Sequence, residues 1–187
     1  FPDFLPSTWT LNFWAKGLVS CFDPVLTTVF TGMAAAFIGL ILTIGCLEYD
    51  VNFRRNKTRQ NPAKNYNSLL QYFLYLPLLI PQITFMAGIQ LLLVIMKMDG
   101  YWITLLWSHL LFVLPYMFIA LSATYQAYDK RLFNQAMLLR RSYTAALFRI
   151  KLPMLLRPIL FSFAIGFSVS VAQYIPTMLV GAGRFST

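Results

Sequence analysis

The stretch VLTTVFTGMAAAFIGLILTIGCL, residues 25–47, has 23 residues and no charged side chain. A helix of about 20 apolar residues crosses the roughly 30 Å hydrocarbon core of a bilayer, so this stretch is long enough to span a membrane. Further uncharged runs of 26 to 32 residues occupy positions 65–96, 100–128 and 158–183. The sequence therefore predicts an all-α integral membrane protein with four transmembrane helices.

The composition agrees with a membrane protein. Hydrophobic residues make up 58% of the chain and charged residues only 11%, whereas about a quarter of an average soluble domain is charged. Too few polar residues exist to cover the surface of a soluble domain. We expect no nucleic-acid partner, because membrane topology accounts for the net charge of +9.

The basic residues are concentrated in two segments. Twelve of the 15 lysines and arginines lie within positions 54–64 and 130–157. Short loops rich in lysine and arginine stay in the cytoplasm, where they face anionic lipid headgroups. We therefore expect both segments to be cytoplasmic and both chain ends to be periplasmic.

Residues 1–22 are expected to form a periplasmic lead-in to the membrane domain at 23–187. Because the chain starts at Phe1 rather than methionine, we expect a fragment of a longer protein.

Small residues recur at four-residue spacing in two of the expected helices. Such spacing lets helix backbones approach closely in lipid, where little hydrophobic force drives association. The residues are Gly32 and Ala36, Ala35 and Gly39, and Ser162, Gly166 and Ser170. The pattern predicts a packed helix bundle without indicating what the bundle does.

Prolines interrupt three of the expected helices, at Pro77, Pro81, Pro115 and Pro176. Proline lacks a backbone donor and kinks a helix, which a membrane tolerates where neighbouring helices or a cavity satisfy the freed carbonyls. These kinks favour a transporter or channel. A non-transport four-helix assembly or anchoring subunit is the alternative interpretation, and a membrane-embedded enzyme is a further one.

Few polar side chains fall within the uncharged runs. Gln82, His109 and Gln173 are the candidates to line a solute path, because lipid exposure would leave them without hydrogen bonds. An interhelical hydrogen bond is the ordinary alternative for His109, and a proton relay is a third. With one histidine, no cluster of metal ligands and no nucleotide-binding loop, we expect no catalytic residue, metal site, cofactor or enzymatic activity.

The segment 126–157 carries the most specific pattern. Asp129 can cap a helix over 130–141, and Ser142 can cap a second helix over 143–150 that ends at Leu152-Pro153. Ala136 and the later Ile150-x-Leu152-Pro153 resemble the cytoplasmic "EAA" loop in permease subunits of ATP-binding-cassette importers. An amphipathic element lying on lipid is the alternative.

Other parts of the chain resemble the same family. They are Leu76-Pro77-x-x-x-Pro81 with Gly88, Ser108-His109-Leu110-Leu111-Phe112-x-x-Pro115, Val171-Ala172-Gln173-Tyr174-x-Pro176-Thr177, and Gly181-Ala182-Gly183-Arg184. Together they resemble the second half of fused, two-halved permeases near the thiamine and iron(III) branch. The motif's Glu, first Ala and Gly are replaced by Asn134, Gln135 and Arg140.

The resemblance implies a bacterial inner-membrane protein with a five- or six-helix permease core. It also implies cytoplasmic ATPase subunits, a second permease half and a periplasmic solute-binding protein as partners. We name the segment 126–157 the coupling loop, because in this family it contacts the ATPase. The expected contact residues are Asn134, Gln135, Ala136, Leu139, Arg140, Arg141, Tyr143, Phe148, Leu152 and Pro153.

Overall fold

The computed structural model describes residues 12–60, 69–128, 135 and 143–181. All regular secondary-structure elements within these residues are helices, and no strand occurs among them. The elements are α1 (Asn12–Gln60), α2 (Leu69–Leu79), α3 (Gln82–Ile95), α4 (Trp102–Ala127), α6 (Tyr143–Ala146), the π-helical turn η1 (Leu147–Lys151), α7 (Leu152–Met154), α8 (Leu156–Val171) and α9 (Tyr174–Val180). The predicted all-α membrane fold is confirmed.

Two helices in the described part of the chain are long and apolar enough to cross a membrane unbroken. They are the Phe22–Val51 portion of α1 and the whole of α4. Two further helix pairs qualify only if each pair, bent at a break, counts as one span, so the described residues provide between two and four spans. The runs at 65–96 and 158–183, which were expected to form kinked helices, each contain a break between two shorter helices.

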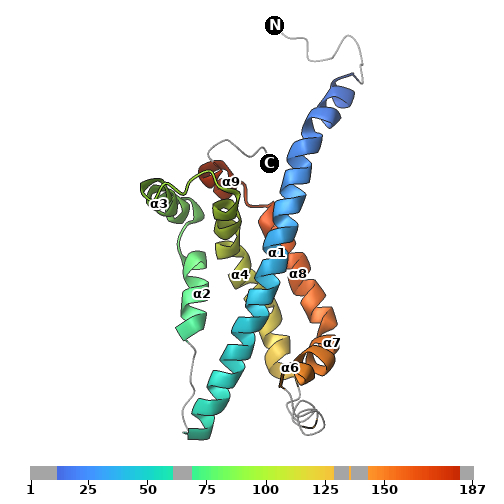
Figure 1. Ribbon diagram of the computed structural model, residues 1–187, viewed down its shortest axis with the longest axis vertical. Coiled ribbons are helices and arrows are strands. Elements are labelled where there is room, and N and C mark those ends of the chain that lie inside the picture. The colour runs from blue at the N-terminus through green and yellow to red at the C-terminus, as the bar shows by residue number, and fades with distance from the viewer. Residues whose placement is uncertain (1–11, 61–68, 129–134, 136–142, 182–187) are drawn as a thin grey trace, which may run out of the picture.

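The first of these runs breaks between α2 and α3. The two helices meet at an angle of 108°, and Figure 1 shows α3 turned away from the axis of α2. Pro81 precedes α3 with an extended ψ of 128°, and its ring disfavours helical geometry at Ile80. The break thus lies where a proline begins the next helix.

The second run breaks between α8 and α9. Gln173 separates the two helices with φ −84° and ψ 75°, outside the helical region. Pro176 was expected to kink a continuous helix, but it lies in the first turn of α9, where a helix needs no donor from it. The kink is at Gln173, three residues earlier than the proline.

The predicted small-residue faces lie at the contacts among α1, α4 and α8. A side chain at Gly32 would meet Phe167 of α8, and one at Gly39 would meet Val113 of α4. On α8, Ser162 donates a hydrogen bond to the backbone carbonyl of Met117, 3.1 Å away. Close backbone approach therefore holds these three helices together, as the spacing indicated.

Gly166 is the tightest of these contacts and gives a stability prediction. A Cβ placed there would lie 2.5 Å from Sδ of the fully buried Met117. Overpacking of this kind costs about 1–3 kcal/mol, so Gly166→Leu should lower the thermal unfolding temperature of the full-length protein in detergent. Gly45→Leu is the matched control, because nothing lies within 4 Å of that position. Equal unfolding temperatures for the two variants would contradict the packing argument.

Both basic segments adjoin the same end of the bundle. In Figure 1 the C-terminal end of α1 lies at the lower end, as do α6 and α7. The upper end carries α3, α9 and the turn at 96–101, where Gly100 has φ 71° and donates to the carbonyl of Val180. The arrangement therefore groups the segments that the charge pattern assigns to one side of the membrane.

Candidate solute path and coupling loop

The three residues predicted to line a solute path gather around the break between α8 and α9. Gln82 and Gln173 line one pocket of about 200 Å³. His109 and Gln173 line a second pocket of about 140 Å³, together with Thr28 and Thr31 of α1. Gln173 belongs to both pockets, so the unwound residue between two short helices connects the three candidates.

His109 joins α4 to both sides of that break. Its Nδ1 lies 2.8 Å from Oγ of Ser170, and its Nε2 lies 3.2 Å from Oγ1 of Thr177. The Thr177 hydroxyl gives its own hydrogen to the carbonyl of Gln173 at 3.1 Å, so it accepts from Nε2–H. Nδ1 lies against the Ser170 hydroxyl, and the protonation of the ring sets which of the two groups donates. The interhelical hydrogen bond is present, and it places His109 in the pocket wall.

The side chain of Gln173 is the unusual polar group of this region. It is only 6% exposed, yet neither amide atom has a hydrogen-bond partner among the described residues. Buried polar atoms are nearly always paired with protein or water, and leaving one unpaired costs about 1–3 kcal/mol. An amide in this setting can bind water or a polar solute in the adjoining pockets.

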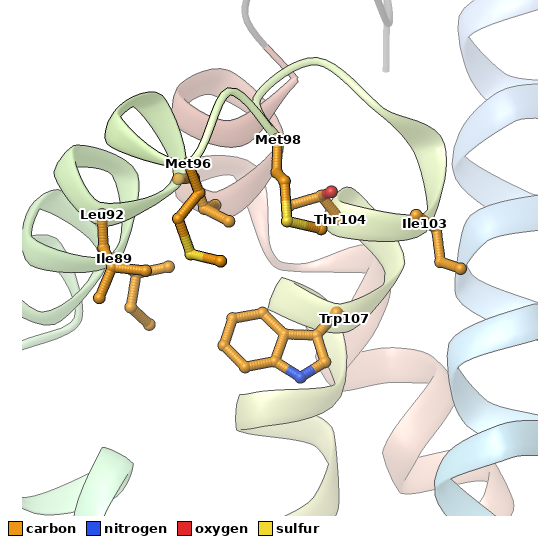
Figure 2. Close-up of a pocket in the computed structure, with 8 residues that line it drawn as sticks. Ile89, Leu92, Met96, Met98, Ile103, Thr104 and Trp107 are labelled. Atoms are coloured by element: carbon orange, nitrogen blue, oxygen red, sulfur yellow. The ribbon is translucent and has the colours of Figure 1, made fainter.

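A larger pocket of about 440 Å³ lies between α3 and α4 and contains none of the three path candidates. Figure 2 shows the Trp107 ring beneath Met96 and Met98. The lining consists of Ile89, Leu92, Leu93, Met96, Met98, Ile103, Thr104 and Trp107. A lining this apolar offers a polar solute few hydrogen bonds, so we do not assign the path to it.

The coupling loop is described only in part. Gln135 is helical and exposed. Outside the described residues lie the proposed caps Asp129 and Ser142 and the contact residues Asn134, Ala136, Leu139, Arg140 and Arg141. Tyr143, Phe148, Leu152 and Pro153 are described, and the second helix of the loop can be compared with the prediction.

That second helix begins at Tyr143 as predicted but runs past its expected end. Leu147–Lys151 form a π-helical turn, and Leu152–Met154 continue in helical geometry. Pro153 does not break the helix, because it stands in the first turn of α7, where a missing donor costs nothing. The chain instead turns at Leu155, with φ −94° and ψ 13°, and enters α8 at an angle of 74°.

The side chains of this helix point in different directions. Phe148 is 66% exposed, and Pro153 is also exposed. Tyr143 is half-buried, and its hydroxyl donates to Oε2 of Glu48 on α1 at 2.6 Å. Phe148 is therefore available to a partner protein, whereas the Tyr143 hydroxyl is directed toward the membrane helices.

Glu48 is the centre of a polar cluster at this end of the bundle. Lys151 donates to its Oε1 at 2.6 Å and forms an ion pair in which the lysine is 6% and the glutamate 12% exposed. Tyr125 of α4 donates to the same oxygen. Nζ of Lys151 also lies 4.1 Å from the centroid of the Tyr125 ring, within cation–π range. Four side chains from α1, α4 and the coupling loop thus meet.

One comparison with known proteins bears on this arrangement. Over 165 residues the chain is 36% identical to the inner membrane ABC transporter permease protein YnjC of Escherichia coli (strain K12). This segment is homologous to an ABC transporter permease. The match covers 88% of the chain but only 29% of that relative, and no protein-family model matches the chain. The resemblance to an ABC transporter permease is confirmed.

Sequence reasoning missed two functional candidates, Glu48 and Lys151. The nearest signals were positional: Glu48 is the first charge after the uncharged run at 25–47, and Lys151 is the one charge within 150–156. Lys151 was counted only among the basic residues of the segment 130–157, and Glu48 was given no role. Their pairing across 103 positions is visible only in the fold.

Proposed function

We propose that this chain is part of the transmembrane permease of an ATP-binding-cassette importer in a bacterial inner membrane. The observation that carries the proposal is the 36% identity to a named inner-membrane ABC transporter permease across 88% of the chain. The helical fold with membrane-length apolar helices supports it. The chain provides part of the solute path and a loop that receives the ATPase.

The proposed function requires three partner proteins, which supply ATP hydrolysis, the rest of the solute path and delivery of the solute. Cytoplasmic ATPase subunits hydrolyse ATP, a second permease half completes the path, and a periplasmic binding protein delivers the solute. The ATPase docks on the coupling loop, where Phe148 offers a large exposed aromatic side chain. Membrane lipid surrounds the outer faces of the helices.

The solute path runs along the α8–α9 break. Gln82, His109 and Gln173 support this assignment, because they line two adjoining pockets that share Gln173. Non-helical backbone at membrane depth is tolerated where it lines a cavity, and transporters use such breaks at their binding sites. The solute itself is not specified by these side chains.

The whole proposal is tested by transport in vesicles. The full-length permease, its ATPase and its binding protein, reconstituted together, should accumulate solute only when ATP and binding protein are both present. Uptake without ATP would contradict ATP-driven import. No uptake by a fully assembled complex, across the solutes that the binding protein retains, would favour the anchoring alternative.

The orientation gives a second prediction, based on the basic segments at 54–64 and 130–157. In full-length protein free of other reactive cysteines, Met98→Cys should react with a membrane-impermeant maleimide in intact cells. Asn56→Cys should react only after permeabilisation, because α1 carries it to the opposite end of the bundle (Figure 1). Labelling of Asn56→Cys alone in intact cells would reverse the assigned topology.

A further inference from the structure

We propose that Glu48 is a positioning residue that joins the coupling loop to α1 and α4, so that a displacement of the loop by the ATPase moves both helices. This inference rests on the proposed function, because it takes the coupling loop as the ATPase contact. It goes beyond that function by naming the residues that transmit the movement into the membrane.

The geometry places one carboxylate among donors from separate parts of the chain. Among the described residues, Oε1 of Glu48 accepts from Tyr125 and Lys151, while Oε2 accepts from Tyr143. Tyr125 belongs to α4, and the other two donors belong to the coupling loop. Lys151 additionally lies over the Tyr125 ring. The loop is therefore bonded to α1 directly and to α4 through the same group.

The burial of this cluster makes it resist separation. The ion pair of Lys151 and Glu48 is largely buried, and removing one partner from a buried pair leaves an uncompensated charge, which is strongly unfavourable. A loop that moved away from α1 would leave both charges without each other and Glu48 without the Tyr143 hydroxyl. Movement of the loop and helices as one body avoids that penalty.

The cluster lies beside two irregularities of the backbone, a π-helical turn and a bend. Lys151 ends the π-helical turn η1, and π-turns occur frequently at functional sites. Four residues later the chain bends at Leu155 and enters α8 by a 74° turn. Loop movement can thus enter the membrane along two routes: through the backbone into α8, and through Glu48 into α1 and α4.

The test separates transmission from docking in the full-length importer reconstituted in vesicles. Glu48→Gln, Lys151→Met and Tyr143→Phe should each lower the solute transported per ATP hydrolysed, by about tenfold for the first two, because each weakens hydrogen bonding to a charged group. For Glu48→Gln and Lys151→Met, ATPase association should stay close to wild type. Arg149→Met, an exposed cation on the same turn, is the matched control for loss of a positive charge and should leave the solute transported per ATP unchanged.

A purely structural role would have a different signature. It would lower the amount of folded importer while leaving the solute per ATP unchanged in the molecules that assemble, and that result would overturn the inference. Tyr143→Phe is a milder change, because it keeps the aromatic ring. The solute transported per ATP can therefore be measured for this variant if the charge variants do not assemble. Phe148→Ala provides the separate check: unchanged ATPase association there overturns the docking assignment itself, whatever the Glu48 variants do.

Discussion

Replacing Phe148 with alanine is expected to weaken binding of the ATPase to the full-length permease about 30-fold, which corresponds to about 2 kcal/mol. Phe148 is 66% exposed in the middle of η1, at the end of the bundle that carries the basic segments. Interfaces take most of their binding energy from a few central aromatic or arginine side chains, and charged residues at the rim mainly tune the association rate.

The matched control is Phe161→Ala. Phe161 is 63% exposed, but it belongs to α8, in the apolar part of the helix beyond the bend at Leu155. Titration of the ATPase onto permease in lipid nanodiscs should give a wild-type dissociation constant for this variant. Equal dissociation constants for both alanine variants would show that the coupling loop is not the ATPase contact and would favour a loop lying on lipid.

The membrane fold could be predicted from the long apolar runs that lack charged residues, but the breaks within the helices could not. Pro77 and Pro115 lie inside α2 and α4 without ending them, whereas Pro81 stands at a 108° break. A proline therefore breaks the helix at one position and is accommodated at another, because packing around each helix decides whether the lost hydrogen bond is tolerated. The break at Gln173 has no proline at all, so local sequence rules placed it three residues too late.

Sequence reasoning likewise selected some of the candidate functional residues and missed others. Polarity within an apolar run marked Gln82, His109 and Gln173 as candidates, because unpaired polar groups are costly in lipid. The Glu48 cluster could not be found, since its three donors lie 77 to 103 positions from Glu48 and each residue has an ordinary local explanation at a membrane boundary. Contacts between distant helices are set by the packing of the whole bundle, and one sequence does not specify them.

Gln173→Leu is expected to abolish uptake while leaving the importer assembled and at least as stable as the wild type. The Gln173 amide is buried without a partner among the described residues, so an apolar side chain of similar size removes a cost of about 1–3 kcal/mol. A group that stabilises the protein when lost, yet is needed for transport, is typical of a functional site. Vesicle uptake and thermal unfolding in detergent measure the two effects on the same preparation.

The control for this variant is Gln90, a half-buried glutamine. Gln90 on α3 has an Oε1 atom that is also buried without a described partner, but it lines neither of the two polar pockets. Gln90→Leu should therefore change stability in the same direction as Gln173→Leu and leave uptake intact. If Gln173→Leu transports at the wild-type rate, or if both variants lose uptake equally, the location of the amide at the α8–α9 break is irrelevant to transport. The three polar residues would then serve helix packing alone.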